Sequence, residues 1–392
     1  MSLSLVGVPL LVLLTCAIVL FSVVALVGGR RLQRAGRAKW AVYSVRTVAL
    51  VLSQVMAVAL VGAIVNRQYG FFVSWGDLFG TAKVTTTSQN TGASGPLLPG
   101  KNTVPNVGGS YRASGRTVYA SHQSPWPKRS HVYPKSALGW GRVDMYLYGP
   151  QSHIYGQVQV LLPPNWTPHP ARPYPVVEIL PGFPGTFTTM TGAFGVRTVI
   201  ENAVAHNKLR APIVVSVQDH AGRDSECINS QLGQWATWLA KDVPTWLATH
   251  VGATNDPAAR TTLGFSMGGY CANMLTVKYP QVFAGSISLS GYTAPAFQAP
   301  QPLQRTPAMM RTYDLAPILF AHPPRVRMWM QTDPQDLISY PATAHFLARH
   351  VQAPASVTVF VSTGVGHNFR VISDFMPPAL TWLTHALPAF AK

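Results

Sequence analysis

The chain of 392 residues is long enough for one large catalytic domain with accessory segments, and its hydrophobic fraction of 47% supports a substantial core. Charged residues make up only 11%, far below the usual share of about a quarter, and the first 65 residues contain six of them, all basic. The net charge is +17, but the sequence contains no block of five or more like charges. We therefore expect the protein to be attracted to an anionic envelope surface and to have no nucleic-acid partner.

The first apolar run covers residues 5–27 and contains no charged residue. As a helix it is long enough to cross a hydrocarbon core of about 30 Å, so we predict a transmembrane span. A secretory signal peptide is the alternative. It would need a basic leader and a shorter apolar stretch, and no Lys or Arg precedes Leu5.

A second uncharged run, residues 47–65, meets the same length requirement, although a buried helix of a soluble domain is the alternative. Six basic side chains lie in the loop between the runs, residues 28–46. Cytoplasmic loops carry such an excess, which predicts that both chain ends face the outside of the cell. Residues 1–80 are therefore interpreted as a bilayer anchor, with the aromatic-rich residues 66–80 near the outer interface.

After the anchor, residues 81–136 are rich in Thr, Ser, Gly, Asn and Pro. This composition buries too little apolar surface to offset the entropy of the chain, so we predict a flexible polar linker. The catalytic domain is then expected at residues 137–392, outside the membrane.

Short β-type segments begin near Gly141. Two partly alternating segments come first, at 142–149 and 156–164, as in an antiparallel entry to a sheet. Six continuous apolar segments suit strands covered on both faces, at 176–182, 212–219, 261–266, 285–291, 326–332 and 356–362. Helical patterns alternate with them, at 196–208, 231–250, 267–279, 343–351 and 377–387. This order predicts an α/β fold with a mostly parallel sheet of about eight strands, preceded by two transmembrane helices.

Ser266 lies in the pentapeptide GFSMG, between a predicted strand and a predicted helix. A nucleophile elbow needs this context, because a strained turn pushes the hydroxyl outward and only small neighbours such as Gly264 and Gly268 avoid collision. A structural serine in a turn is the alternative, since the bare pattern also arises by chance. We favour Ser266 as a catalytic nucleophile.

A serine hydroxyl is a poor nucleophile at neutral pH and needs a histidine that is oriented by a carboxylate. His367 stands in the loop TGVGHNF, just after the last predicted strand, where an imidazole can reach the carboxyl edge of the sheet. A surface histidine is the alternative. We favour His367 as the general base.

The acid is expected in the turn after the penultimate strand, which contains two carboxylates, Asp333 and Asp336. In this fold a short turn commonly precedes the acid, which favours Asp336. Asp333, beside a proline, suits the ordinary role of a turn residue but remains the alternative acid.

Attack on a carbonyl creates an oxyanion, which preorganised donors stabilise. We expect one donor to be the backbone N–H of Met267. The other should come from the loop LPGFPG (residues 180–185), where we favour the backbone N–H of Phe183. A simple Pro/Gly turn is the alternative for that loop.

No metal or cofactor is expected, because the sequence has no HExxH, paired CxxC, phosphate-loop or dinucleotide motif. In the polar segment DHAGRDSEC, Asp219 and Asp224 could line a pocket mouth or serve as turn residues. Of the three cysteines, one lies in the first apolar run. Cys227 and Cys271 remain, either as a disulfide or as two free buried thiols.

Five segments together resemble the putative-esterase family of α/β-hydrolases, which includes esterase D-like enzymes and the mycolyltransferases of actinobacterial envelopes. They are LPGFPG, GRDSEC, GFSMGGYCA, the Asp333/Asp336 turn and GVGHNF. The resemblance covers roughly residues 142–387. It implies an α/β-hydrolase fold and ester hydrolysis or acyl transfer at Ser266. Two features depart from the family: Pro181 stands where many esterases have His, and the apolar start is not part of the family core.

The leading hypothesis is an extracytoplasmic serine esterase of a bacterial cell membrane, acting on an acyl ester or lipid substrate. An acyltransferase that passes acyl groups to envelope glycans is the second hypothesis. The third is an inactive hydrolase-fold domain that serves as a surface binding module.

Overall fold

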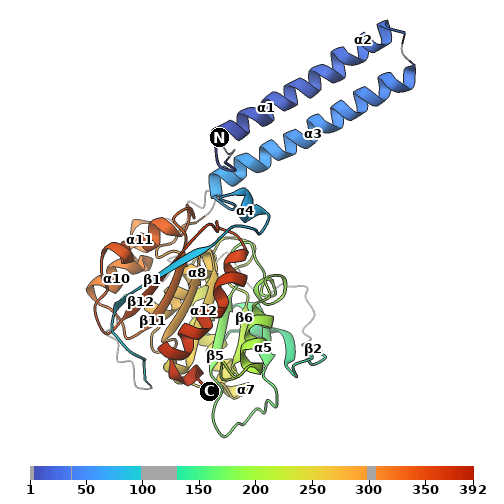
Figure 1. Cartoon of the computed structure of the whole chain (residues 1–392). Helices are drawn as coiled ribbons and strands as arrows, with labels where there is room; N and C mark the ends of the chain where they lie inside the picture. Colours follow the sequence, from blue (N-terminus) through green and yellow to red (C-terminus); the bar gives the residue numbers. More distant parts are fainter. Residues whose placement is uncertain (1–3, 37, 99–129, 298–305) are drawn as a thin grey trace. The chain divides into compact units, whose positions relative to one another are not determined.

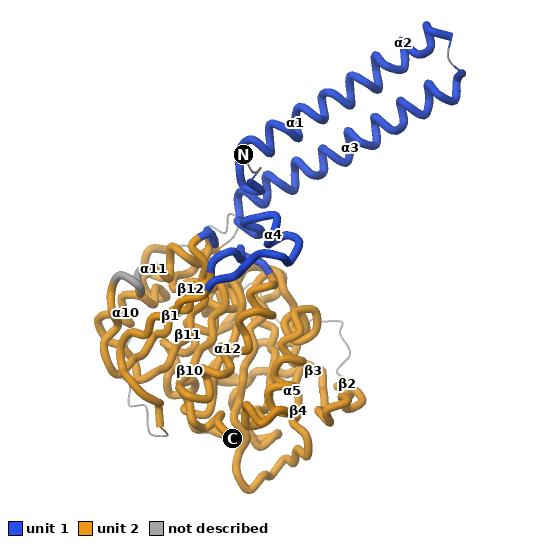
Figure 2. The backbone as a smooth tube through the Cα atoms, viewed as in Figure 1, with its two compact units in different colours: residues 1–85, 335–337, 363–368 blue, residues 86–334, 338–362, 369–392 orange. Residues whose placement is uncertain are grey.

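The computed structural model describes residues 4–36, 38–98, 130–297 and 306–392. The chain divides into two compact units, which Figure 2 shows in blue and orange. Unit 1 contains residues 1–85 together with two short loops, 335–337 and 363–368, and unit 2 contains the rest. Both loops lie within residues 137–392, the range that the sequence predicts as the catalytic domain.

Two long apolar helices form most of unit 1 (Figure 1). The first apolar segment comprises α1 (Val8–Val23), a π-helical turn (Val24–Gly28) and α2 (Gly29–Arg34), and the second is α3 (Lys39–Tyr69). The two run side by side, with Ser22 Oγ 3.1 Å from Ser53 Oγ. A short helix, α4 (Trp75–Leu78), follows.

Both helical segments, Val8–Arg34 and Lys39–Tyr69, are long and apolar enough to cross a membrane by length and composition. Their large apolar side chains are mostly exposed, including Val19, Leu26 and Val58. A core helix of a soluble domain would bury such side chains. The exposure therefore disfavours the alternative interpretation of the second run as a buried soluble helix.

Unit 2 is built on a large mixed sheet whose strand order is β1-β12-β11-β10-β9-β5-β6-β4-β3-β2. From β12 to β6 the neighbouring strands are parallel, and from β6 to β2 they are antiparallel. The strands are β1 (Thr85–Gly92), β2 (His131–Tyr133), β3 (Gly141–Tyr148), β4 (Tyr155–Leu162), β5 (Val176–Leu180), β6 (Ile213–Val217), β9 (Arg260–Phe265), β10 (Gly285–Leu289), β11 (Arg327–Thr332) and β12 (Ser356–Thr363). All eight strands predicted after Gly141 are confirmed. A separate hairpin pairs β7 (Asn229–Ser230) with β8 (Gly233–Gln234).

Helices lie between the strands in the chain, as the alternating pattern predicted. They are α5 (Val196–Ala205), α6 (Trp235–Thr237), α7 (Val243–His250), α8 (Met267–Lys278), α9 (Pro307–Tyr313), α10 (Leu315–Ala321), α11 (Tyr340–Ala348) and α12 (Arg370–Ala386), with π-helical turns at Thr189–Ala193 and Trp238–Asp242 and 3-10 turns at Pro257–Ala259 and Pro388–Phe390. The helix α12 begins at Arg370, before the expected start at residue 377, although Pro377 and Pro378 lie inside it. The helix continues through the prolines because its buried apolar stripe packs on the sheet. This packing outweighs the loss of the two backbone N–H donors that prolines lack.

The expected linker, residues 81–136, contains two strands among its described residues. Residues 85–92 form β1, next to β12, and 131–133 form β2, while 99–129 lie outside the described residues. β1 has mostly exposed polar side chains, so burial does not hold it. Backbone pairing at the sheet edge does, supported by Asn90 Oδ1, which accepts from Ser356 Oγ at 2.9 Å and Thr358 Oγ1 at 3.1 Å.

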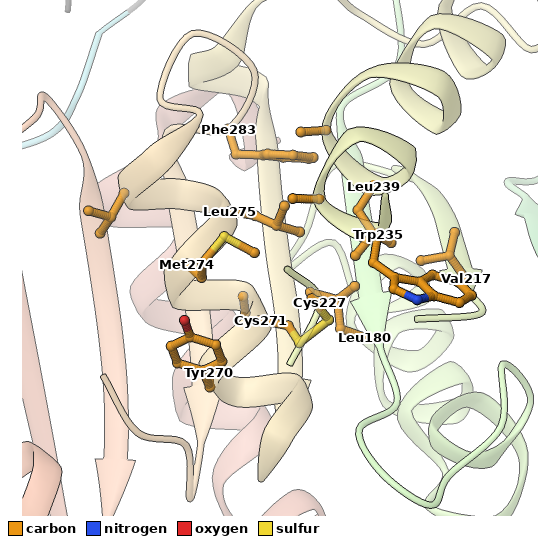
Figure 3. Close-up of a cluster of buried hydrophobic side chains, with 14 of the residues drawn as sticks. Leu180, Val217, Cys227, Trp235, Leu239, Tyr270, Cys271, Met274, Leu275 and Phe283 are labelled. Atoms are coloured by element: carbon orange, nitrogen blue, oxygen red, sulfur yellow. A yellow bond between two sulfur atoms is a disulfide. The ribbon is translucent and has the colours of Figure 1, made fainter. Parts of the chain in front are cut away.

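The core of unit 2 surrounds α8, the helix that follows Ser266. Figure 3 shows Tyr270, Met274 and Leu275 of α8 among buried apolar side chains. Cys271 of this helix forms a disulfide with Cys227, with Cα atoms 5.6 Å apart. The amino end of α8 is therefore fixed both by packing and by a covalent bond.

Candidate active site

Ser266 occupies a sharp turn between β9, which ends at Phe265, and α8, which begins at Met267. Its backbone has φ 57° and ψ −123°, a conformation that costs a non-glycine residue about 1–3 kcal/mol. The side chain is only partly buried. Strain at an accessible serine between a strand and a helix is the geometry of a nucleophile elbow.

The two flanking glycines make this turn possible. A Cβ on Gly264 would collide with the backbone of Gly268, and a Cβ on Gly268 would collide with the carbonyl oxygen of Leu180. The sequence GFSMG therefore has glycine where the backbone segments approach most closely.

The loop after β5 packs directly on this turn. Gly182 has φ 79°, and a Cβ there would lie 2.7 Å from the Phe265 carbonyl oxygen and 2.9 Å from the Gly268 nitrogen. Phe183 follows, half-buried, with its ring against the His220 ring at a centroid distance of 5.2 Å. The two candidate oxyanion donors, Phe183 and Met267, thus come from backbone segments that are in contact.

Asp219 holds the loop of residues 180–185 through a hydrogen bond to its backbone. It is buried, and its Oδ2 accepts a hydrogen bond from the Gly182 nitrogen at 3.0 Å. Burial raises the pKa of Asp219 to about 6, while His220 and the hydrogen bond from Gly182 act in the opposite direction.

His220 supports the same loop. Its Nδ1 accepts from the Gly222 nitrogen at 3.1 Å, so its Nε2 carries the proton and donates to the Gly185 carbonyl oxygen at 2.7 Å. Of the two interpretations of DHAGRDSEC, the structure favours turn residues over the lining of a pocket mouth, since Asp219 and Asp224 are both buried.

The disulfide joins this supporting segment to the nucleophile helix. Cys227 closes the DHAGRDSEC segment, and Cys271 lies five residues after Ser266. Asp219, Cys227 and Cys271 are also the one group of close metal-type ligands among the residues that the structure describes. Because the two sulfurs are bonded to each other, this group is not a metal site.

Asp336 and His367 lie together in unit 1. His367 Nδ1 is 3.1 Å from Oδ1 and 3.0 Å from Oδ2 of Asp336, and both side chains are buried. Because a carboxylate can only accept, Nδ1 carries the proton and Nε2 is left as an acceptor. This tautomer is the one that a general base needs.

The structure therefore brings the candidate residues together in two sets. Ser266, Met267 and Phe183 belong to unit 2, and Asp336 and His367 belong to unit 1. Asp333, the alternative acid, is a buried residue of unit 2 directly after β11. Sequence reasoning missed Asp77, a buried carboxylate that contacts the loop of His367, because residues so far apart in the chain carry no shared local pattern.

A family model described as "Putative esterase" matches residues 155–386, more than half of the chain. The match contains the Ser266 turn, the Asp333/Asp336 turn and the His367 loop. It begins at β4 and ends with α12.

Among known proteins, an uncharacterized protein of Corynebacterium glutamicum is 28% identical over 137 residues, which are 34% of this chain and 32% of that protein. The MPT51 antigen of Mycobacterium leprae is 40% identical over 63 residues, 16% of this chain and 20% of the antigen. A diacylglycerol acyltransferase/mycolyltransferase Ag85C of Mycobacterium avium is 35% identical over 63 residues, 16% of this chain and 17% of that enzyme. The chain thus matches a third or less of the length of each of these relatives.

Solved hydrolase structures share the fold. An S-formylglutathione hydrolase from Agrobacterium tumefaciens superposes with a TM-score of 0.51 and 17% identity, over 64% of this chain and 98% of that protein. A ferulic acid esterase superposes with a TM-score of 0.50 and 16% identity, over 62% of this chain and 98% of that protein. The predicted α/β-hydrolase fold is confirmed, preceded by two apolar helices.

Proposed function

The chain belongs to the putative esterase family, and we propose that it is a membrane-anchored serine esterase that hydrolyses carboxylic esters through an acyl-enzyme on Ser266. The family makes it a serine hydrolase or acyltransferase and disfavours the inactive binding module. The observation that carries the assignment is the strained, accessible turn at Ser266, which fits a nucleophile elbow.

In the proposed mechanism, Ser266 Oγ attacks the ester carbonyl carbon while its proton passes to Nε2 of His367. Asp336 accepts from Nδ1 and stabilises the imidazolium that forms. The oxyanion accepts hydrogen bonds from the backbone N–H groups of Met267 and Phe183, each contributing about 3 kcal/mol to the lowering of the barrier. The alcohol leaves with the proton from His367.

Water then completes the reaction. His367 removes a proton from the water molecule, whose oxygen attacks the acyl carbon and releases the carboxylic acid from Ser266. The proton returns to the serine oxygen through His367. No metal or cofactor takes part in this proposal.

The location proposed is the outer face of a bacterial cell membrane, with the segments Val8–Arg34 and Lys39–Tyr69 as spans. Exposed apolar side chains on both helices support a lipid surrounding. The basic loop at residues 28–46 supports a cytoplasmic position for the helix connection. A disulfide in unit 2 supports an oxidising compartment for that unit.

Acyl transfer is the second candidate, favoured by the similarity to the diacylglycerol acyltransferase/mycolyltransferase Ag85C of Mycobacterium avium. The chemistry differs only in the second step, where a sugar hydroxyl of an envelope glycan would replace water. A lipid acyl donor would then be the first substrate.

The test uses the full chain in detergent with nitrophenyl esters of short acyl groups and a fluorophosphonate probe. We expect nitrophenol release, probe labelling that maps to Ser266, and loss of both in Ser266→Ala. Full activity in that variant would remove Ser266 from the mechanism. Adding trehalose or arabinan separates the two candidates, since an acylated sugar supports transfer and free acid alone supports hydrolysis.

A further inference from the structure

Asp77 is a fully buried carboxylate in the short helix α4, shortly after α3 ends at Tyr69. Its own nitrogen donates to Ser74 Oγ at 3.0 Å, and its Oδ2 accepts from the Val73 nitrogen at 3.1 Å. Burial of a charge is costly unless donors compensate it. The remaining donors come from elsewhere in the chain.

Two of them belong to the loop that carries His367. The Gly366 nitrogen donates to Asp77 Oδ2 at 2.9 Å, and Asn368 Nδ2 lies 3.2 and 3.1 Å from the two carboxylate oxygens. Asp77 therefore holds the residue on each side of His367.

The residues just before Asp77 hold the same loop through their carbonyl groups. The Gly70 oxygen accepts from the His367 nitrogen at 2.9 Å, and the Phe71 oxygen accepts from Asn368 Nδ2 at 2.7 Å. A Cβ on Gly366 would collide with both of these oxygens, so the two segments are in direct contact.

Gly70 also contacts the turn that carries the candidate acid. A Cβ on Gly70 would lie 3.2 Å from the Gln335 carbonyl oxygen and 3.4 Å from the Leu337 side chain, the residues before and after Asp336. Gly70 has φ 66°, which suits glycine at the carboxyl end of α3. One short segment thus touches the loops of both Asp336 and His367.

We propose that residues 70–77, the Asp77 clasp, position the Asp336–His367 pair for catalysis, with Asp77 as the principal positioning residue. The inference rests on the proposed function. The clasp follows the second apolar helix directly, so this N-terminal segment is part of the catalytic machinery in addition to being an anchor. Catalysis is sensitive to such support, because misplacement of a reacting group by about 1 Å can reduce the rate about 100-fold.

The test compares Asp77→Asn with the wild-type full chain in detergent. The substitution keeps the size of the side chain but replaces one acceptor oxygen with an NH2 donor, which cannot accept from Gly366 or Asn368. We expect kcat to fall about 10- to 100-fold with KM changed less than about twofold. Asp256→Asn is the matched control and should keep the wild-type kcat, since Asp256 caps the turn Pro257–Ala259 and Asn caps equally well.

A double-mutant cycle with Asn368→Ala separates positioning from a general loss of stability. Both variants disturb the contact between Asp77 and Asn368, while Asp77 also accepts from Gly366 and Asn368 also donates to Phe71. The loss of kcat in the double variant should therefore be clearly smaller than the product of the two single losses. Asn368→Ala alone gives a second test of the clasp if Asp77→Asn does not fold.

The outcomes are distinct. A wild-type chain no faster than Ser266→Ala overturns the proposed function and this inference with it. An active wild type, with wild-type kcat in Asp77→Asn and in Asn368→Ala, overturns the inference alone. Strictly multiplicative losses of kcat in the double variant also overturn it.

Discussion

The imidazole of His367 donates its Nδ1 proton to Asp336, with distances of 3.1 and 3.0 Å to the two carboxylate oxygens. Of the two carboxylates in the turn after β11, Asp336 thus has the contact that a catalytic acid requires. The pair is buried, which strengthens the hydrogen bond and fixes the tautomer of the imidazole.

We therefore predict that Asp336→Asn lowers kcat by about 10⁴-fold, because an amide stabilises the wrong imidazole tautomer. Asp333→Asn is the matched comparison, three residues earlier in the same turn, and should retain kcat within about tenfold. Steady-state hydrolysis of a nitrophenyl ester below the melting temperature of both variants gives the answer. A larger loss in Asp333→Asn than in Asp336→Asn would make Asp333 the acid.

Much of the fold could be predicted because its signals are local. Continuous apolar segments predicted the strands β5, β6, β9, β10 and β11, because central strands that are covered on both faces need apolar side chains throughout. The Ser266 turn was also visible, because glycines before and after the serine reflect the close backbone contacts found there.

Features that depend on distant contacts could not be predicted. β1 has the sequence TTTSQNTG, which has neither apolar alternation nor a core face, and only its position beside β12 makes it a strand. Asp77 lies in an aromatic segment that suggested a membrane interface, and its partner Gly366 is 289 residues away. The candidate acid could be narrowed to Asp333 and Asp336, and of these Asp336 lies in contact with His367.

A second prediction concerns Glu178, a buried residue of β5 whose carboxyl oxygens have no hydrogen-bond partner among the described residues. Burial raises its pKa to about 8 from the ordinary 4.5, and Arg260 opposes this only in part. As pH rises from about 4.5 to about 8, the unfolded chain loses this proton while the folded chain retains it. The free energy of unfolding should therefore decrease over this range, by roughly 5 kcal/mol at most.

Glu178→Gln removes the titrating group, so the variant should lack this part of the decrease. Denaturant unfolding of both chains at pH 5 and pH 8, followed by tryptophan fluorescence, measures the difference. Equal changes between the two pH values in the wild type and the variant would show that Glu178 ionises normally in the folded chain.

The disulfide between Cys227 and Cys271 gives a third prediction. It closes a loop with a sequence separation of 44, for which chain entropy predicts stabilisation by about 4 kcal/mol. The double variant Cys227→Ala/Cys271→Ala should lose free energy of unfolding of that order. Cys16→Ala is the control, because Cys16 is an exposed free cysteine of α1. Comparable stability of the double variant and the control would mean that packing around α8 fixes this region without the bond.

The last prediction tests the membrane topology in intact cells, with an impermeant maleimide and a Cys16→Ala background that leaves no free thiol. Ala35→Cys lies in the basic loop between the apolar helices, and Ser88→Cys lies on β1, and both positions are exposed. We expect labelling of the Ser88→Cys variant in intact cells and of the Ala35→Cys variant only after permeabilisation. The reason is electrostatic, since transfer of six basic residues across the membrane opposes the usual retention of Lys and Arg on the cytoplasmic side. Labelling of the Ala35→Cys variant in intact cells would show that the topology is the reverse of the one proposed. The proposed esterase would then act inside the cell, where a disulfide does not persist.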